Sequence, residues 1–267
     1  MAAIFQRTNN FYNWMMEKRD PRVEDWLLMK TPLATSVIFF LYLLVVWQGP
    51  KLMKNREPLK LKWILIPYNF GLVILSFHMF YEFLVTSVLS SYSYICQPVD
   101  YSYNPLPMRM ARVCWWFFFS KVIELLDTVF FILRKKNEQV TFLHVYHHCS
   151  MIINWWLGAR FVAGGQSFFV AMLNSFVHVI MYTYYGLAAF GPHMQKYLWW
   201  KRYLTRMQLT QFFAFLVHTS INLVTECDYP KEYCLAVFLY AISLILLFGN
   251  FYRKTYSQTK SKEAKFD

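Results

Sequence analysis

The sequence predicts an all-α membrane protein with seven transmembrane helices. Three observations carry the prediction: 57% of the 267 residues are hydrophobic, the mean hydropathy is +0.27, and the apolar residues gather in separate segments joined by short connections. Such a chain is too apolar for an ordinary water-soluble domain, and each segment can cross a hydrocarbon core at about 1.5 Å of helix per residue. The segments are 32–49, 63–89, 112–133, 139–157, 167–190, 204–224 and 232–252.

The basic residues predict the orientation, because cytosolic connections of membrane proteins are rich in Lys and Arg. The net charge of +12 gathers in alternate connections and in the tail, which favours a membrane-side or phosphate-bearing partner over nucleic acid. The alternation predicts a non-cytosolic N-terminal segment 1–31, a seven-helix catalytic domain 32–252 and a basic cytosolic tail 253–267. The basic positions are Lys51, Lys54, Arg56, Lys60, Lys62, Arg134, Lys135, Lys136, Lys196, Lys201, Arg202, Arg206, Arg253, Lys254, Lys260, Lys262 and Lys265.

This topology also sorts the five cysteines. Cys96 and Cys227 fall in non-cytosolic connections, where a disulfide can persist, so we predict a bridge between them. Cys234 lies close to Cys227 and is the alternative partner. Cys114 and Cys149 fall within apolar segments, where free cysteines act as small core residues.

The stretch from His144 to His148 places three imidazoles in the fourth apolar segment. At roughly 100° per residue, His144, His147 and His148 share one face of a helix. Ionisable groups at membrane depth are costly and usually mark a functional site. The alternative is three core histidines bonded to each other or to the backbone, but three in five residues are hard to explain by packing. We therefore interpret this stretch as catalytic.

The third segment adds Lys121, Glu124 and Asp127 within seven positions. Three ionisable residues so close together in a spanning helix again indicate a site. Lys121 and Glu124 either bind substrate or form a polar network between helices. Asp127 is the candidate for orienting a histidine, because a carboxylate partner fixes the tautomer of an imidazole and raises its basicity.

The fifth and sixth segments supply further polar side chains. Asn174, His178, Tyr182 and Tyr185 lie within roughly 80° of one another on a helix, whereas Tyr184 lies off this face. We interpret the first set as the wall of a site. On the sixth segment, glutamines recur at three-residue spacing, and they either bind a ligand or hold helices together. These are Gln208 and Gln211.

Helical rise places these groups at similar depths. Asp127 and His147 each lie roughly 9–13 Å from the cytosolic end of their segments, and His178 lies roughly 15 Å from the end of its own. The other half of the predicted bundle supplies mostly apolar and aromatic residues. The pattern predicts a slot with polar chemistry near a basic cytosolic mouth and an apolar closed end. It suits a molecule with an anionic head and a long hydrocarbon tail.

Four motifs in this order resemble the signature boxes of the ELO family of very-long-chain fatty acid elongases. The resemblance runs from Asp20 to about Tyr256 and is strongest to members that make very long saturated and polyunsaturated chains. The motifs are Lys121-x-x-Glu124-x-x-Asp127-Thr128, His144-Val145-Tyr146-His147-His148, Asn174-x-x-x-His178-x-x-Met181-Tyr182-x-Tyr184-Tyr185 and Thr205-x-x-Gln208-x-x-Gln211.

The resemblance implies six of the seven helices forming an inverted barrel around an acyl tunnel in the endoplasmic reticulum membrane, with a luminal N-terminus. It implies condensation of a long-chain acyl-CoA with malonyl-CoA to 3-oxoacyl-CoA, CO2 and CoA, without cofactor or metal. Implied partners are membrane lipids, the ketoacyl reductase, dehydratase and enoyl reductase of the elongation cycle, and other elongase copies in a homo- or hetero-oligomer. The tail Lys262–Asp267 departs from the pattern, since it lacks a full dilysine retrieval signal.

The resemblance, joined to the helical positions, assigns roles. His147 attacks the thioester and forms an acyl-imidazole, since a covalent intermediate divides a difficult transfer into two easier steps. His144, His148 and Asp127 orient or activate it, and His178 assists with protons or the enolate. Asn174 and the tyrosines stabilise oxyanions. Lys201 and Arg202 meet the CoA phosphates.

Three alternatives remain at this stage. Cys149 is the rival nucleophile, although it points roughly 140° away from His144 on a helix. His-x-x-His-His also occurs in membrane di-iron desaturases and hydroxylases, but these need several histidine clusters, and the other four histidines here are single. A seven-helix receptor or transporter would fit the topology, but the seventh segment is almost wholly apolar.

Overall fold

The computed structural model describes residues 1, 6–7, 9–10, 13 and 16–257. Between residues 16 and 257 the chain forms eight α-helices and no β-strand, so the predicted all-α class is confirmed for this part. Short 3₁₀ turns lie at η1 (Pro21–Val23), η2 (Asn137–Gln139) and η3 (Pro192–Tyr197), and a π turn, η4, follows at Arg253–Ser257. The helices are α2 (Pro32–Leu52), α3 (Lys62–Leu89), α4 (Pro105–Ile123), α5 (Leu126–Leu133), α6 (Phe142–Phe161), α7 (Ser167–Ala189), α8 (Lys201–Val224) and α9 (Lys231–Tyr252).

Four of the described helices are long and apolar enough to cross a membrane, which indicates a multi-pass membrane protein. The remaining long helices are α4, α6 and α8. They carry Lys121, the three histidines from His144 to His148, and Gln208 with Gln211, and such polar side chains lower the mean hydropathy of these helices. The four spans are Pro32–Leu52, Lys62–Leu89, Ser167–Ala189 and Lys231–Tyr256.

The third predicted segment is two helices rather than one. α4 starts at Pro105, earlier than the predicted 112, because proline is well suited to a first helical position. It ends before Glu124, where the amides of Leu125 and Asp127 reach back only three residues, to Val122 and Glu124. The chain then resumes as α5. The tightened turn lies next to the buried Glu124, so the helix breaks where the polar side chains gather.

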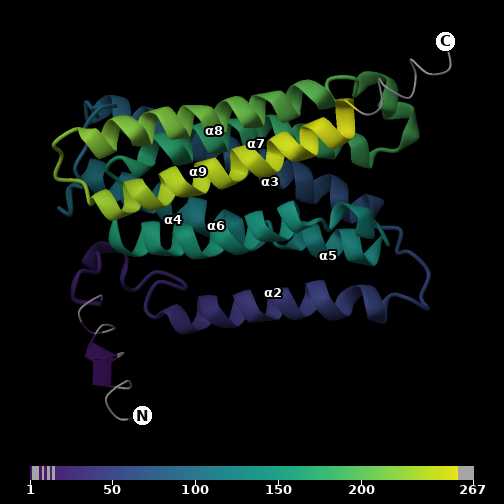
Figure 1. Ribbon diagram of the computed structural model, residues 1–267, viewed down its shortest axis with the longest axis horizontal. Coiled ribbons are helices and arrows are strands. Elements are labelled where there is room, and N and C mark those ends of the chain that lie inside the picture. Colours follow the sequence, from purple (N-terminus) through teal and green to yellow (C-terminus); the bar gives the residue numbers. More distant parts are fainter. Residues whose placement is uncertain (2–5, 8, 11–12, 14–15, 258–267) are drawn as a thin grey trace.

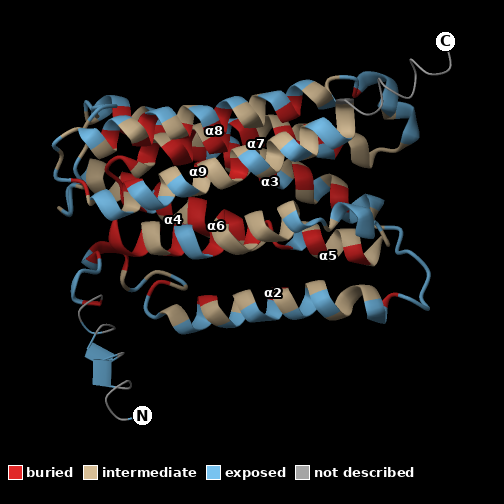
Figure 2. Cartoon of the chain, viewed as in Figure 1, coloured by how far each residue is buried: buried red, intermediate tan, exposed pale blue. Residues whose placement is uncertain are grey.

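The long helices run side by side along the longest axis of the molecule (Figure 1). Six helices form a closed series of contacts in the order α3, α4, α6, α9, α8 and α7, with α7 contacting α3 again, and α4 also contacts α7 across the series. Helix α2 stands apart, touching α5 and α6. Its surface is mostly exposed, whereas buried residues concentrate on α4, α6, α7 and α8 (Figure 2). A helix this apolar and this exposed is suited to face lipid.

The connections divide between the two ends of the molecule (Figure 1). The basic end comprises connections 53–61, 134–141 and 190–200 together with η4. Here the Leu59 amide donates to Leu133 O and Lys135 Nζ donates to Lys54 O. The opposite end, which we call the disulfide end, comprises 16–31, 90–104, 162–166 and 225–230. The alternation of basic and poorly basic connections in the sequence therefore corresponds to two ends of the fold.

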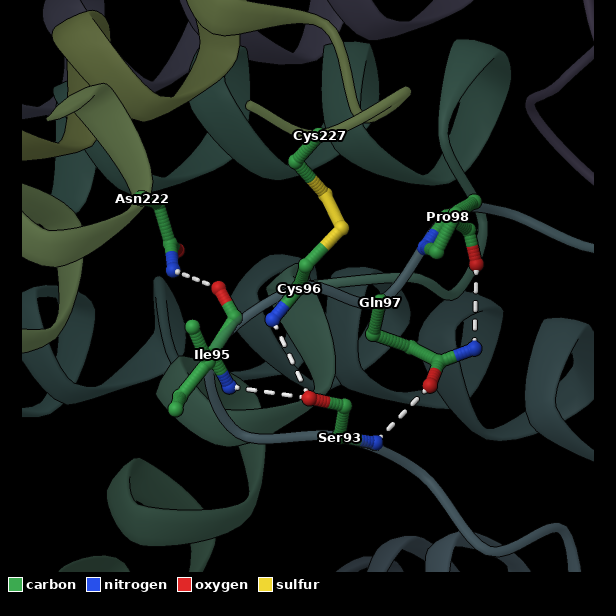
Figure 3. Close-up of a disulfide and its surroundings, with 7 residues drawn as sticks. All are labelled: Ser93, Ile95, Cys96, Gln97, Pro98, Asn222 and Cys227. Carbon is green, nitrogen blue, oxygen red and sulfur yellow. Dashed lines mark hydrogen bonds between the residues drawn. A yellow bond between two sulfur atoms is a disulfide. The ribbon is translucent and has the colours of Figure 1, made fainter. Parts of the chain in front are cut away.

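A disulfide joins Cys96 to Cys227 across the disulfide end, which is the predicted pairing (Figure 3). The alternative partner, Cys234, is free and buried on α9. Beside the bridge, Asn222 Nδ2 donates to Ile95 O at 2.9 Å, and Ser93 Oγ accepts from the Cys96 amide at 3.1 Å. The bridge and these bonds attach connection 90–104 to the α8–α9 turn.

The segment before α2 is anchored at the same end by a buried ion pair. Arg22 Nη2 lies 2.6 Å from Asp20 Oδ2, and both side chains are fully buried. The same guanidinium donates to the carbonyls of Asp100, Pro107 and Ala163. Burial acts to lower the pKa of Arg22, but the hydrogen bond and charge of Asp20 outweigh it and raise that pKa. Arg22 thus ties three separate stretches of chain together at the disulfide end.

Candidate functional site

A buried polar cluster lies where α4 meets α7. Lys121 Nζ is 2.7 Å from Glu124 Oε1, 3.2 Å from Asn174 Oδ1 and 3.4 Å from His178 Nδ1. His178 Nδ1 is also 3.4 Å from Glu124 Oε1, and Ser120 Oγ donates to the same carboxylate at 3.3 Å. A buried ammonium and carboxylate are tolerated only when both are paired in this way. Of the two interpretations of Lys121 and Glu124, the polar network between helices is present, and it includes the predicted site residues Asn174 and His178.

The histidine box occupies the first turns of α6. Thr141 caps the helix by accepting a hydrogen bond from the His144 amide at 3.2 Å, so α6 starts at Phe142, later than the predicted 139. The rings of His144 and His148 are 4.3 Å apart, and those of His147 and His148 are 5.5 Å apart, nearly perpendicular. The three imidazoles therefore form one contiguous group, as the helical spacing predicts.

The partner of His144 is Thr128 rather than Asp127. Thr128 Oγ1 lies 2.8 Å from His144 Nε2, and Tyr42 Oη of α2 lies 3.0 Å from the same hydroxyl. Asp127, one residue earlier, accepts a hydrogen bond from Tyr182 Oη at 3.0 Å. Successive residues on α5 point about 100° apart, so only one of the two can face α6. These hydrogen bonds therefore pair Asp127 with a tyrosine and not with a histidine, contrary to the expectation that Asp127 orients a histidine.

An elongated cavity connects the histidine box to the disulfide end. Its wall is apolar and aromatic except at a few positions, and it holds about 690 Å³ of non-atom space, part of it open to the outside. His147 and Asn174 are among its polar lining residues, whereas Cys149 lies away from it, against the group formed by Tyr42, Leu125 and Ile152. The lining from α6 is His147, Met151, Asn154, Trp155 and Gly158, with Val162 just beyond it.

Helix α9 contributes tyrosines that the sequence analysis missed. Tyr240 Oη accepts a hydrogen bond from Ser150 Oγ at 2.8 Å, and Tyr146 Oη lies 2.8 Å from Ser243 Oγ. Tyr240 also lines the cavity, as do Tyr229 and Tyr233 nearer the disulfide end. The available signal was the seven-residue spacing from Tyr233 to Tyr240, which places both on one face of α9.

Two of the other expected contacts differ from the helical-wheel assignment. Tyr184 is 7% exposed and packs edge-on against Trp200 at 5.0 Å, whereas Tyr185 is 40% exposed. Tyr185 still contacts Tyr182, their rings lying 6.0 Å apart. A helical wheel places the two tyrosines by their angle alone and assumes a single buried face. Because α7 packs against helices on two sides, a wider arc of its surface is buried.

The two glutamines of α8 have different surroundings. Gln208 Nε2 lies 3.5 Å from Met181 Sδ, which joins α8 to α7. Gln211 is 3% exposed, and its Oε1 has no hydrogen-bond partner within the described residues. Gln208 therefore links α8 to α7. Gln211 instead presents a buried acceptor next to Phe212, a residue of the cavity wall.

At the basic end, Arg202 and Arg206 share one hydroxyl. Arg202 Nε donates to Tyr252 Oη at 2.8 Å and Arg206 Nε donates to it at 2.9 Å. Lys201 is exposed beside them at the start of α8. Each guanidinium uses only its Nε on the tyrosine, which leaves the Nη groups available for an anion. Within the described residues, no group of three or more His, Cys, Asp or Glu side chains is arranged to hold a metal ion.

Comparison with known proteins gives close relatives over nearly the whole chain. It is 57% identical over 264 residues to very long chain fatty acid elongase 4 of Homo sapiens, covering 99% of this chain and 84% of that protein. It is 49% identical over 260 residues to elongase 7 of Rattus norvegicus (96% and 92% covered) and 46% identical over 266 residues to elongase 5 of Xenopus tropicalis (99% and 89%). The sequence also matches the family described as ELO: GNS1/SUR4 over residues 27–264. Its four polar motifs, its relatives and this match together establish that the chain belongs to the ELO: GNS1/SUR4 family.

Proposed function

We propose that this protein lengthens a long-chain acyl-CoA by two carbons taken from malonyl-CoA, releasing CO2 and CoA. Its family and relatives make it a very-long-chain fatty acid elongase, a 3-oxoacyl-CoA synthase. The observation that carries the chemistry is one cavity in which His147 and Asn174 share an otherwise largely apolar lining. Family membership accounts for the same histidines without a di-iron hydroxylase or a receptor.

The cavity supports a substrate with a long hydrocarbon tail. From His147 to Val162 its α6 wall extends roughly 22 Å by helical rise. Apolar and aromatic side chains from α7, α8 and α9 complete the wall, and burying a chain of methylenes there is favourable at about 0.8 kcal/mol each. The acyl chain lies in this tunnel with its thioester near His147, between α6, α7, α8 and α9 of the six-helix series. Lys201, Arg202 and Arg206 at the basic end supply cations for the CoA phosphates.

In the first half-reaction, His147 attacks the acyl thioester carbonyl. The C–S bond breaks, the acyl group stays on the imidazole nitrogen, and the imidazole proton leaves with the CoA thiolate to give free CoA. His148 packs edge-on against His147, with the His144 ring tilted against His148 behind it, and these contacts hold the ring of His147 in place. Asn174 stabilises the oxyanion, because a donor aimed at a developing charge lowers the barrier.

In the second half-reaction, malonyl-CoA enters and loses CO2. The electron pair released by the C–C cleavage forms an enolate, whose carbon attacks the acyl-imidazole carbonyl and displaces the imidazole. The product is 3-oxoacyl-CoA, and the displaced imidazolate of His147 takes up one proton from solvent, which restores the neutral imidazole. His178 assists at the enolate: its Nδ1 is already engaged by Lys121 and Glu124, so its Nε2 is the nitrogen left for substrate.

The fold supports seven crossings of the endoplasmic reticulum membrane, with α4 and α5 together making the third. The cytosolic face is the basic end, following the preference of Lys and Arg for that side. The disulfide end is luminal, where the Cys96–Cys227 bridge persists. The N-terminal segment 1–31 is then luminal and the tail 253–267 cytosolic, although residues 258–267, including the Lys262 and Lys265 positions, lie outside the described part.

The place of this step in elongation determines its functional partners. Its 3-oxoacyl-CoA product requires reduction, dehydration and a second reduction before the chain is saturated again. A ketoacyl reductase, a dehydratase and an enoyl reductase in the same membrane, together with further elongase copies, are the partners we propose.

The test is to detect the acyl-enzyme. Purified protein incubated with long-chain acyl-CoA alone should release CoA and gain the mass of one acyl group, and labelled malonyl-CoA should then discharge that mass with release of CO2. His147→Ala should prevent the adduct without loss of fold, whereas Cys149→Ala should retain it. The route through His147 is wrong if His147→Ala still forms the adduct, or if Cys149→Ala abolishes it.

A further inference from the structure

Helix α2 stands outside the six-helix series, yet it places one polar side chain beside the histidine box. Only Thr35 and Tyr42 of α2 are buried. Tyr42 is 4% exposed and packs with Leu125 and Ile152, and its ring centroid is 6.4 Å from that of His148. Apart from Thr35, the other residues of the helix are exposed or half-buried and mostly apolar, so the hydroxyl of Tyr42 is a specific polar feature of a largely lipid-facing element.

The Tyr42 hydroxyl begins a chain of hydrogen bonds that ends on an imidazole. Tyr42 Oη is 3.0 Å from Thr128 Oγ1, and Thr128 Oγ1 is 2.8 Å from His144 Nε2. The ring of His144 then packs, tilted, against that of His148, whose ring meets that of His147 edge-on. Three helices, α2, α5 and α6, therefore meet in one short path that leads to the proposed nucleophile.

The protons in this chain can be assigned from its buried groups. Within the described residues the structure gives Tyr42 Oη no partner other than Thr128, so its proton must be donated there or be left unpaired at a cost of about 1–3 kcal/mol. With Tyr42 donating to Thr128, the Thr128 proton is donated to His144 Nε2. That nitrogen is then an acceptor, and the proton of neutral His144 lies on Nδ1.

We propose that Tyr42 is a positioning residue that acts through Thr128 to fix the tautomer and orientation of His144. This inference rests on the proposed role of the histidine box in acyl transfer. By holding His144 it also holds the ring of His148 that packs against it, and through His148 the ring of His147. The outer helix α2 thus contributes to the geometry of the acyl-transfer site without lining the cavity.

The structure provides a matched control on the same helix. Thr35 is 6% exposed, and its Oγ1 has no hydrogen-bond partner within the described residues. Thr35→Val and Tyr42→Phe each remove one buried hydroxyl from α2 while keeping the size of the side chain. Only Tyr42→Phe removes a hydroxyl that reaches the histidine box, so a general effect on α2 packing appears in both variants.

The experiment measures the rate of acyl-adduct formation in single turnover, with the KM for acyl-CoA and the thermal stability of each variant. Tyr42→Phe should slow adduct formation by about fivefold to tenfold, the effect of one hydrogen bond, with KM unchanged. Thr128→Val should slow it at least as much, and Thr128→Ser should restore it. The double variant Tyr42→Phe/Thr128→Val should be no slower than Thr128→Val, because both act on one path.

The outcomes separate this proposal from the role of His147. If Tyr42→Phe is as fast as Thr35→Val, or if its effect multiplies with that of Thr128→Val, Tyr42 does not act through Thr128. A rise in KM at an unchanged rate would also overturn the proposal, since it would place the effect on substrate binding. The role of His147 is tested separately by His147→Ala. We expect this variant to form no adduct, whatever the Tyr42 and Thr128 variants show.

Discussion

Lys121 Nζ lies 3.2 Å from Asn174 Oδ1, a contact between residues 53 positions apart on α4 and α7. An ammonium can only donate, so the amide oxygen of Asn174 must face Lys121 and its NH2 group must face away. Asn174 also lines the cavity. The lysine therefore orients the amide so that its N–H groups are the ones available to a reacting carbonyl.

Asn174→Asp should remove that donor while keeping the shape of the side chain and its pairing with Lys121. We expect kcat to fall by roughly 10²–10³-fold, as when one oxyanion donor is lost, with little change in the KM for acyl-CoA. Steady-state release of labelled CO2 from malonyl-CoA measures both. Ser175→Ala is the control, since within the described residues the Ser175 hydroxyl donates only to Ala171 O of its own helix. Near-normal turnover in Asn174→Asp would show that Asn174 does not stabilise the oxyanion.

The Cys96–Cys227 bridge joins residues 131 positions apart, so its loss should destabilise the fold more than it slows the reaction. Cross-links that close long loops typically contribute about 2–5 kcal/mol. Cys96→Ser should lower the thermal midpoint, and a reductant should lower that of the wild type by a similar amount but leave the variant unchanged. Cys114→Ser is the comparison for a free buried thiol: it keeps the bridge, so reductant should lower its thermal midpoint by as much as that of the wild type. Equal midpoints for oxidised and reduced wild type would contradict the prediction.

The parts of the fold that follow from periodicity and charge were predictable from the sequence. The apolar segments mark the long helices within a few residues, and the alternating Lys and Arg content corresponds to two ends of the molecule. The cysteines could be paired because topology placed Cys96 and Cys227 at the same end. These are properties of single segments or of their order, and they need no knowledge of how helices pack.

The features that depend on how the helices pack against one another were not predictable from the sequence. The break at Glu124 depends on Lys121 and on His178, a residue from another helix, so the run 112–133 reads as continuous by hydropathy. The choice of Thr128 over Asp127 as partner of His144 depends on how α5 is rotated against α6. Tyr42 gave no signal at all, because a tyrosine in a lipid-facing helix is ordinary until its hydroxyl is seen to have a partner.

Gly165 should tolerate no larger side chain. Its φ is +56°, and an added Cβ would lie 2.7 Å from Tyr229 Cδ2 and 2.9 Å from Gln97 O. The left-handed backbone alone costs alanine roughly 1–2 kcal/mol, and the clash adds to it. Gly165→Ala should therefore unfold at lower temperature and, because Tyr229 lines the cavity, alter the length of the chains accepted. Thermal unfolding and product profiling measure the two effects.

The control for Gly165 is a glycine with open space around it. An added Cβ at Gly71 of α3 meets nothing within 4 Å, and alanine is favoured over glycine in a helix by up to about 1 kcal/mol. Gly71→Ala should keep or raise the thermal midpoint and keep the product profile. If Gly165→Ala and Gly71→Ala have the same thermal midpoint and the same product profile, the positive φ and the contacts with Tyr229 and Gln97 do not constrain Gly165.

Tyr252 should assist CoA binding by holding two arginines together. Its hydroxyl accepts from the Nε of Arg202 and of Arg206, so both guanidiniums are fixed with their Nη groups free for phosphate. Tyr252→Phe should raise the KM for acyl-CoA by about threefold to tenfold with kcat unchanged, since preorganisation affects binding more than the chemical step. Tyr256→Phe removes a neighbouring hydroxyl that has no hydrogen-bond partner within the described residues, and it should leave both constants unchanged. A lower KM in Tyr252→Phe would show instead that the tyrosine competes with CoA for the arginines.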